Sequence, residues 1–261
     1  MNSDSKNQEA VYNTLNQMVL YEDDTYICIN KPAGIAVHGD GRTEMVTVAD
    51  WLLDRCPETE GVGEVQYSQS GEAINRSGIV HRLDRDTSGV LLLVKNQTAH
   101  EQVKYQFQNR LVKKYYRAFV YGEIKDRWGT IDRTIGKSAS DFRKWSAEHG
   151  KKGLVREAVT HWESIGSGEV EGQKFSYLSL RPVTGRTHQL RVHLKAIGRP
   201  IVQDTLYAEK LSIEAPTLGF TRLALHAHEL SISLPEVTVE KFIAPLPMEF
   251  EVAAEAIAGQ G

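Results

Sequence analysis

The sequence predicts an α+β fold built on a large, mainly antiparallel mixed sheet with flanking helices. Segments with the alternation or β-branched content of strands far outnumber segments with helical spacing, and most of them are joined by hairpin turns. No Pro/Gly/Ser-rich linker divides the 261 residues, of which 41% are hydrophobic, enough for a substantial core. We therefore expect one domain over residues 18–261. Before it, residues 1–17 are polar and are expected to form a flexible lead or a short docked helix.

Composition narrows the classes of function. The formal net charge is −3, so the average composition does not indicate a nucleic-acid binder, and phosphate contacts would need a local cluster of Lys and Arg. The two cysteines, Cys28 and Cys56, cannot build a disulfide framework or a metal cluster, which fits a reducing compartment. A polar start without an apolar signal core, and the lack of any apolar stretch of spanning length, predict a cytoplasmic protein with no membrane partner.

In the first part of the chain, residues 18–30 are typical of two strands around an acidic turn, and Lys-Pro-Ala-Gly at 31–34 ends the pairing. Residues 47–55 have helical spacing, with Thr47 as the cap and Trp51 in the core. Residues 57–76 lack periodicity and are expected to form a mobile surface loop. After a strand at 90–94, Thr98 is expected to open a helix over 98–111 through a capping box with Glu101. Three apolar residues at i, i+4 and i+8 would form its core face: Val103, Phe107 and Leu111.

In the second part, residues 112–121 are expected to form a strand, and residues 157–165 and 175–180 two antiparallel strands across a turn at 166–168. A helix should begin at a Thr187 cap and end at Gly198, with a packed stripe made of Leu190, Leu194 and Ile197. A strand over 223–232 should close the sheet, and residues 253–261 should form a short helix with a frayed end.

The stretch from Gly78 to Gly89 carries the densest cluster of ionisable groups and leads directly into the apolar run 90–94. Asp84 lies between Arg82 and Arg85, and a nearby guanidinium would keep its carboxylate ionised, as a nucleophile or base requires. Asp86, Thr87 and Ser88 are suited to closing turns onto backbone amides. The alternative is a solvated loop with fortuitous ion pairs.

Residues 137–156 supply the basic patch that the net charge conceals. Six Lys or Arg oppose two acids there, with Phe142 and Trp145 interleaved, which is typical of a flexible loop that follows an RNA backbone. The alternative is a solvated hairpin. The candidate RNA-binding residues are Arg143, Lys144, Lys151 and Lys152.

Four motifs in order resemble the RluA-type pseudouridine synthases. The first is His81-Arg82-Leu83-Asp84, followed by Thr-Ser-Gly at 87–89; the others are Asn-Lys-Pro-Ala-Gly at 30–34, residues 112–118, and Gly-Arg-Thr-His-Gln-Leu-Arg-Val-His at 185–193. Together they cover residues 19–250. The resemblance implies the pseudouridine synthase fold with a central cleft, and isomerisation of uridine in RNA, in which the N1–C1′ bond breaks and C5 rejoins C1′.

The resemblance also implies roles for single residues. Asp84 would be catalytic, Arg82 would fill the gap left by a flipped nucleotide, and Arg191 would pair with Asp84. Strand alternation puts Lys114 and Tyr116 on one face, where Tyr116 could stack on the extruded base; a half-buried structural tyrosine is the alternative. His81 and Lys114 are also expected beside the substrate. Asp84 could attack the ribose, attack the uracil ring or remove a sugar proton.

No metal, nucleotide or other cofactor is expected. His188, His193, His226 and His228 lack carboxylate or cysteine ligands at suitable spacing, which argues against a metal-dependent hydrolase. The other alternative is a non-catalytic RNA-binding protein of the same fold. We expect a monomer acting on large-subunit ribosomal RNA first and transfer RNA second, with no room for the S4-like domain that many relatives carry.

The segment 199–208 departs from the family pattern. Gln203 and Ala208 stand where relatives usually have glycine. This puts the conformation of the local turn in doubt, because glycine tolerates backbone angles that glutamine does not.

Overall fold

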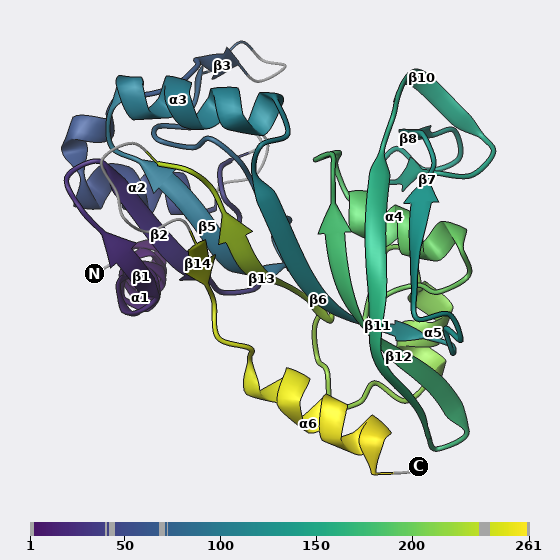
Figure 1. The fold of residues 1–261 in the computed structure, drawn as a ribbon. Helices are drawn as coiled ribbons and strands as arrows, with labels where there is room; N and C mark the ends of the chain where they lie inside the picture. The colour runs from purple at the N-terminus through teal and green to yellow at the C-terminus, as the bar shows by residue number, and fades with distance from the viewer. Residues whose placement is uncertain are drawn as a thin grey trace. The chain divides into compact units, whose positions relative to one another are not determined.

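The computed structural model describes residues 3–39, 41, 45–67, 71, 73–234 and 241–259. They form two compact units (Figure 1). Unit 1 contains Met1–Val112 and Glu229–Pro245, and unit 2 contains Lys113–His228 and Leu246–Gly261. The predicted α+β class with an extensive, mainly antiparallel sheet and flanking helices is confirmed. The domain boundaries and the central cleft remain predictions.

Unit 1 is built around strand β5, Ser88–Val94, whose residues are all buried. It pairs antiparallel with β2, Tyr26–Lys31, which pairs in turn with β1, Val19–Glu22. The acidic turn between β1 and β2 is closed by Asp23 Oδ1, which accepts from the backbone N–H groups of Thr25 and Tyr26. The strand β13, Leu225–Ser231, enters this unit at its end and pairs with β14, Lys241–Ile243. The strands predicted at 18–30, 90–94 and 223–232 are thus confirmed.

The N-terminal helix of unit 1 packs against the second helix. Residues Ser3–Gln17 form α1, in which Leu15 is fully buried and Asn16 Oδ1 accepts from Trp51 Nε1 at 3.0 Å. Trp51 lies in the core on α2, Val48–Arg55, as predicted. Thr47 caps α2, and Asp50 completes the capping box by accepting from the Thr47 N–H. Of the two expected forms of the N-terminal segment, Ser3–Gln17 thus adopts the docked helix.

The predicted start of the third helix is wrong. Helix α3 spans Gln97–Gln108, and its cap is Asn96, whose side chain accepts from the Ala99 N–H at 2.9 Å. Asn is as good a cap as Thr, and it comes two residues earlier. Because α3 ends at Gln108, Leu111 lies beyond it and is 58% exposed, whereas Val103 is buried and Phe107 packs against the core.

Residues 57–76 are not one irregular loop. They include the 3₁₀ helix η1, Pro57–Thr59, and the strands β3, Gln66–Tyr67, and β4, Ala73–Ile74, which pair antiparallel. Residues 68–70 and 72 of this segment lie outside the described residues. Gly78 then anchors the chain, since its N–H donates to Val62 O and its carbonyl accepts from Val94 N.

The sheet of unit 2 has the antiparallel order β6-β12-β11-β7 (Figure 1). Helix α6, Met248–Ala258, packs against β11 and begins five residues before the helix predicted at 253–261. Phe119 of β6 lies at the centre of this core, stacked on Tyr177 and in tilted contact with Phe220 and Phe250. The bounds of the four strands are β6 Lys113–Tyr121, β7 Trp128–Asp132, β11 Val159–Val170 and β12 Gln173–Pro182.

The turn predicted at 166–168 is wrong. Strand β11 continues through these residues with a bulge between Ser164 and Gly166, and it turns at Glu171-Gly172, with φ values of 51° and 77°. Positive φ at both central residues is the hairpin geometry that suits twisted strands. Gly168 instead permits close packing, since a Cβ there would lie 2.1 Å from Ile257 O of α6.

Residues 137–156 form structure that the sequence did not predict. They contribute to a three-stranded sheet in the order β10-β8-β9, made of β8 Ile135–Ser138, β9 Trp145–Ser146 and β10 Lys151–Arg156. Val192 of helix α4, Gln189–Ala196, shares a buried cluster with Ile135 of β8 and with Tyr207, and Trp145 of β9 packs against this cluster. The basic segment is thus connected to α4 through β8 and β9.

Helix α4 begins differently from the prediction. Its N-cap is His188 in the left-handed region, at φ 55°, rather than Thr187. The stripe of Leu190, Leu194 and Ile197 packs on the main core as predicted, and Gly198 follows the helix at φ 70°. A short helix, α5 Glu209–Glu214, lies further along the chain.

Candidate active site

Asp84 lies in a tight loop that leads directly into β5. Its carbonyl accepts from the Thr87 N–H at 3.1 Å, closing a turn just before the strand begins at Ser88. Leu83 and Thr87 on either side are buried, whereas Asp84 is half-buried. Gly89 pairs with Lys31 of β2 at φ 116°, a conformation that favours glycine. The backbone of Asp84 is thus held in a turn directly before a rigid element.

A buried lysine fastens this loop to the neighbouring one. Lys31 is 0% exposed, and its Nζ donates to the carbonyls of Pro32 (2.7 Å), Ile35 (2.8 Å) and Arg85 (2.9 Å). Three donors thereby meet three carbonyl acceptors, which is the full capacity of an ammonium group. The Gly34 N–H adds a fourth link, to Arg85 O at 2.9 Å. The motif at 30–34 therefore supports the backbone beside Asp84.

The two arginines that flank Asp84 contact other groups. Arg82 Nη1 lies 2.9 Å from His38 Nε2, and the ring's Nδ1 lies 2.7 Å from Gly39 O, so Nδ1 donates and Nε2 accepts. Arg85 Nε bonds Asp86 Oδ1 at 3.1 Å in an exposed ion pair. Adjacency in sequence therefore does not establish that either guanidinium acts on Asp84.

His81 is fixed on the side of β5. Its Nε2 accepts from the Leu92 N–H at 3.0 Å, and its ring stacks on Phe107 of α3 with centroids 4.7 Å apart. These contacts give His81 a defined place in unit 1. A role beside the substrate remains a prediction.

In unit 2, β6 brings Lys114 to the motif at 185–193. A Cβ built on Gly185 would lie 3.7 Å from Lys114 Nζ, so the ammonium lies against the first residue of that motif. Burial lowers the pKa of Lys114 from 10.5 to about 8. Tyr116, two residues along, is half-buried and packs against the main core. Alternation along the paired strand puts both side chains on one face.

Arg191 pairs with a carboxylate that we did not predict. Its Nε and Nη2 bond Asp204 Oδ2 and Oδ1, both at 2.8 Å. The pair is buried, with Arg191 9% and Asp204 1% exposed. Asp204 comes from the segment 199–208, in which sequence reasoning considered only the missing glycines. The pairing of Arg191 with Asp84 remains a prediction.

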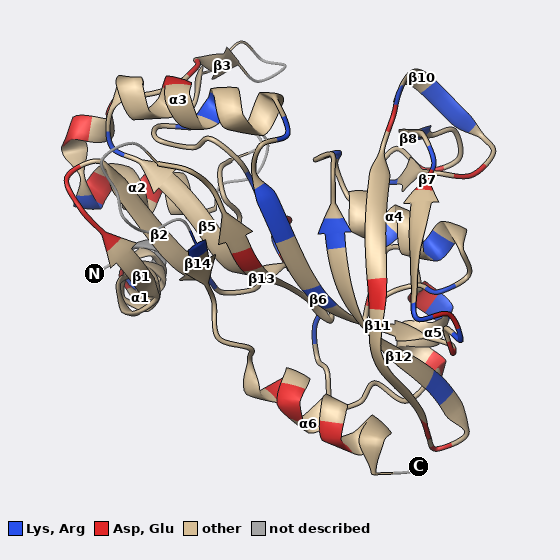
Figure 2. Cartoon of the chain, viewed as in Figure 1, with Lys and Arg blue, Asp and Glu red and all other residues tan. Residues whose placement is uncertain are grey.

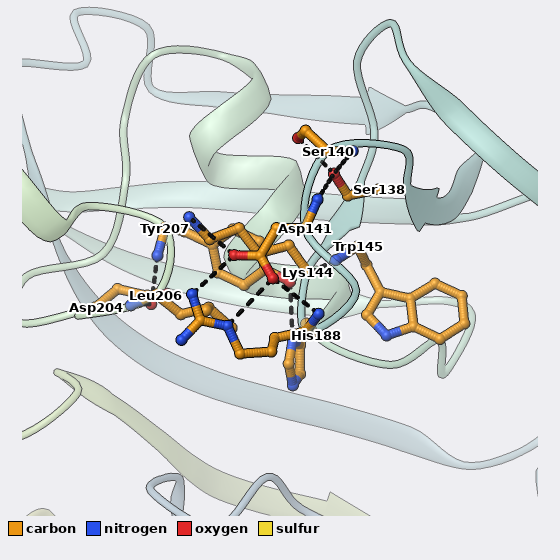
Figure 3. A network of polar contacts seen from close by, with 10 residues as sticks. Ser138, Ser140, Asp141, Lys144, Trp145, His188, Asp204, Leu206 and Tyr207 are labelled. Atoms are coloured by element: carbon orange, nitrogen blue, oxygen red, sulfur yellow. Dashed lines mark hydrogen bonds and ion pairs between the residues drawn. The ribbon is translucent and has the colours of Figure 1, made fainter.

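Tyr207 connects the elements around this pair. Its ring lies 5.0 Å from the Arg191 guanidinium carbon, and its hydroxyl accepts from the Trp145 N–H and bonds His188 Nδ1, at 2.9 and 2.8 Å. Figure 3 shows these bonds together with those from the Leu206 and Tyr207 N–H groups to Asp204. The network therefore ties α4, the segment after it and the three-stranded sheet together.

The turn in this segment adopts a glycine-like conformation without a glycine. Gln203 has φ 57°, in the left-handed region that favours glycine, the residue that the resemblance leads one to expect there. Ala208, at φ −129°, lies outside the left-handed region and caps α5.

His193, one of the histidines considered as a metal ligand, has structural partners. His193 is buried, and its Nε2 donates to Arg133 O at 3.0 Å while Nδ1 accepts from the Thr160 hydroxyl at 2.9 Å. Burial lowers the pKa of His193. Gln189 completes the set by donating to Thr160 Oγ1. In the described part of the chain, no group of three or more His, Cys, Asp or Glu side chains could hold a metal ion.

The basic segment offers fewer unengaged cations than its composition suggests. Arg143 makes a bidentate contact with Asp141, and Lys144 Nζ lies 3.7 Å from the same carboxylate, whose pKa these contacts lower to about 2. Lys151 Nζ donates to Thr134, and Lys152 is exposed. Figure 2 shows the cations along β10. RNA binding by these four residues remains a prediction.

No helix in the described ranges is both long and apolar enough to cross a membrane. Cys28 and Cys56 are buried free thiols.

Comparisons with known proteins agree with the motifs. The model of the RNA pseudouridylate synthase family matches residues 25–196. An uncharacterized RNA pseudouridine synthase of Synechocystis is 40% identical over 89% of this chain, which spans 66% of that protein. The uncharacterized RNA pseudouridine synthase YlyB of Bacillus subtilis is 34% identical over 93% of this chain, which covers 73% of the length of YlyB. The ribosomal large subunit pseudouridine synthase D of Pseudomonas aeruginosa is 34% identical over 89% of this chain, which covers 69% of the length of that protein.

A solved structure supports the fold. Human RNA pseudouridylate synthase domain containing 1 is 27% identical and aligns over 88% of this chain and 83% of its own, with a TM-score of 0.68. The predicted pseudouridine synthase fold is thus confirmed. The family match includes Asp84, Tyr116 and Arg191. The chain belongs to the RNA pseudouridylate synthase family.

Proposed function

We propose that this chain isomerises specific uridines in RNA to pseudouridine, with Asp84 as the catalytic residue. The observation that carries the proposal is the family match over residues 25–196, within which Asp84 lies in a loop just before a buried strand, bonded through the Arg85 carbonyl to Lys31 and Gly34. A carboxylate fixed in this way can act on one nucleotide without first being ordered by it. Attack on the ribose, attack on the uracil ring and removal of a sugar proton remain three possible routes.

The other residues take roles around the extruded nucleotide. A uridine stacked in RNA must leave its stack to meet a carboxylate, and Arg82 would fill the gap left behind. Tyr116 would stack on the flipped ring, and Arg191 would pair with Asp84. Lys114, whose lowered pKa lets it change charge near neutrality, and His81 would lie beside the substrate. Arg143, Lys144, Lys151 and Lys152 would contact the RNA backbone.

Large-subunit ribosomal RNA is the favoured substrate and transfer RNA the second. Support comes from the names of relatives 34% identical to this chain, such as the ribosomal large subunit pseudouridine synthase D of Borreliella burgdorferi. We further propose that the chain acts as a monomer in the cytoplasm, without a metal or nucleotide cofactor.

Tritium release tests the activity and the substrate together. The purified chain is incubated with large-subunit ribosomal RNA and with transfer RNA carrying [5-³H]uridine, because isomerisation frees the tritium at C5. We expect release from the ribosomal RNA that survives EDTA and disappears in Asp84→Asn. RNA binding without release would instead identify a non-catalytic RNA-binding protein, and inhibition by EDTA would favour metal-dependent chemistry.

A further inference from the structure

Asp204 engages one edge of the Arg191 guanidinium and leaves the rest of the group to other contacts. The bidentate bond uses Nε and Nη2, each 2.8 Å from a different oxygen of the carboxylate. Such parallel bonds fix the rotation of the planar group as well as its position. The Nη1 atom is not part of this pair, so its direction is set by the bonds that Asp204 makes.

Asp204 is itself held rigidly. Besides the two guanidinium bonds, its Oδ1 accepts from the backbone N–H groups of Leu206 and Tyr207, both at 3.1 Å. Its side chain is 0% exposed. A buried carboxylate with four donors has little freedom to rotate, so the orientation that it imposes on Arg191 is well defined.

The aromatic ring of Tyr207 contacts the Arg191 guanidinium and restrains it. The guanidinium carbon lies 5.0 Å from the ring centroid, within the range of a cation–π contact. The hydroxyl is bonded to the backbone of Trp145 and to His188, the N-cap of the helix that carries Arg191. The ring therefore cannot move without disturbing both the helix start and the three-stranded sheet.

We propose that Asp204 and Tyr207 are positioning residues that aim Arg191 Nη1 at the reacting uridine or at Asp84. The inference rests on the proposed function. The ion pair of Arg191 with Asp204 has no net charge, so the contribution of Arg191 is a directed N–H donor more than a positive charge. A donor aimed in advance does not have to reorganise as charge develops in the transition state.

The experiment measures single-turnover pseudouridine formation at saturating enzyme on the RNA that releases most tritium, together with RNA affinity. For Asp204→Asn, which keeps the shape but weakens the bidentate bond, we expect the rate constant to fall about 10- to 100-fold. RNA affinity should change less than about twofold, because the pair is buried. Tyr207→Phe keeps the ring and should lower the rate less than Asp204→Asn does.

A double-mutant cycle separates positioning from general structural damage. If Asp204 acts through Arg191, adding Asp204→Asn to Arg191→Gln should lower the rate no further. The same addition should raise the melting temperature of Arg191→Gln, since it removes a buried carboxylate left without its cation. Glu123→Gln, which removes an exposed ion pair with Lys174 in the same unit and outside the basic segment, is the matched control and should leave rate and affinity unchanged.

The outcomes are distinct. Wild-type activity in Asp204→Asn, or rate losses that multiply in the double variant, would overturn the inference while the proposed function stands. Wild-type protein that is folded but releases no tritium from any RNA would overturn the proposed function and the inference with it. If Asp204→Asn fails to fold, as judged by circular dichroism, the double variant compared with Arg191→Gln decides: equal rates support the inference and a further loss overturns it.

Discussion

Replacing Lys31 with methionine tests whether a buried ammonium holds the Asp84 loop. Methionine keeps most of the length and volume of the side chain but removes the three donors to Pro32, Ile35 and Arg85. The Arg85 carbonyl belongs to the residue directly after Asp84. The substitution should therefore loosen the backbone that carries the carboxylate.

The expected loss of stability follows from the three bonds. A hydrogen bond from a charged donor contributes about 1.5–3 kcal/mol, and carbonyls left buried without a donor are unfavourable. Methionine also relieves the desolvation of the buried charge, which offsets part of the loss. We expect the free energy of unfolding to fall by about 3 kcal/mol, which corresponds to a decrease in melting temperature of about 6 °C.

Thermal unfolding and hydrogen exchange measure the two effects separately. The amides of Gly34 and Thr87, which donate to Arg85 O and Asp84 O, should exchange faster in Lys31→Met. Tritium release should fall at temperatures well below the melting point, because Asp84 is less well fixed. Lys104→Met, which removes a more exposed ion pair with Glu64 of the same unit, is the control and should change stability by less than about 1 kcal/mol.

A Lys31→Met variant as stable as the control, with unchanged exchange at Gly34 and Thr87, would refute the reasoning. A stability loss with full activity well below the melting point would refute the functional part alone.

Three further predictions concern backbone conformation and charge. In urea titrations, Gly78→Ala should lower the free energy of unfolding by about 3 kcal/mol, because a Cβ there would lie 2.4 Å from Val94 O at a φ of 70°. Gly172→Ala should lower it by only about 1 kcal/mol, because φ is similar, at 77°, but the space around the Cβ is open. Gln203→Gly should stay within about 1 kcal/mol of wild type, and Gln203→Val should lower the same quantity by about 2 kcal/mol, since a β-branched residue fits φ 57° poorly. Lys114→Met should raise stability at pH 7. The folded pKa of about 8 lies below the unfolded 10.5, so wild-type stability rises with pH across that window and the advantage of methionine disappears by about pH 10.5.

Equal losses for Gly78→Ala and Gly172→Ala would show that the close approach to Val94 relaxes freely. Equal effects of Gly and Val at position 203 would show that the turn changes conformation. A difference between Lys114→Met and wild type that does not depend on pH would contradict the lowered pKa.

Local sequence rules succeeded where one signal acted alone. Thr47 caps α2, and neither of the two residues before it is a good cap. Thr98 does not cap α3, because Asn96, an equally good cap, lies two residues earlier. The glycines at 166 and 168 resembled a turn, but Gly168 is required by the approach of α6, a contact between segments far apart in the chain. Such tertiary requirements leave no local signal.

The candidate site was predictable to a similar depth. The motifs identified Asp84 and Arg191, but the partner of Arg191 in unit 2, Asp204, lies thirteen residues away beyond the end of its helix. Lys31 was visible within the motif at 30–34, yet nothing in its neighbours indicated three backbone carbonyls as its partners. Partners of buried charges depend on packing between segments, which spacing does not encode.

Buried pairs and exposed cations should therefore control different properties of this chain. Lys31 and the Arg191–Asp204 pair are buried, so salt screens them little. In our proposal they act on the rate by fixing geometry. Lys152 and Arg143 are exposed. Contacts of such residues with phosphates weaken at high salt, because the release of counterions from the RNA is then less favourable. Raising the salt concentration should accordingly weaken RNA binding while the single-turnover rate at saturating enzyme stays nearly constant. A rate at saturation that falls in step with affinity would mean that positioning and RNA binding depend on the same side chains.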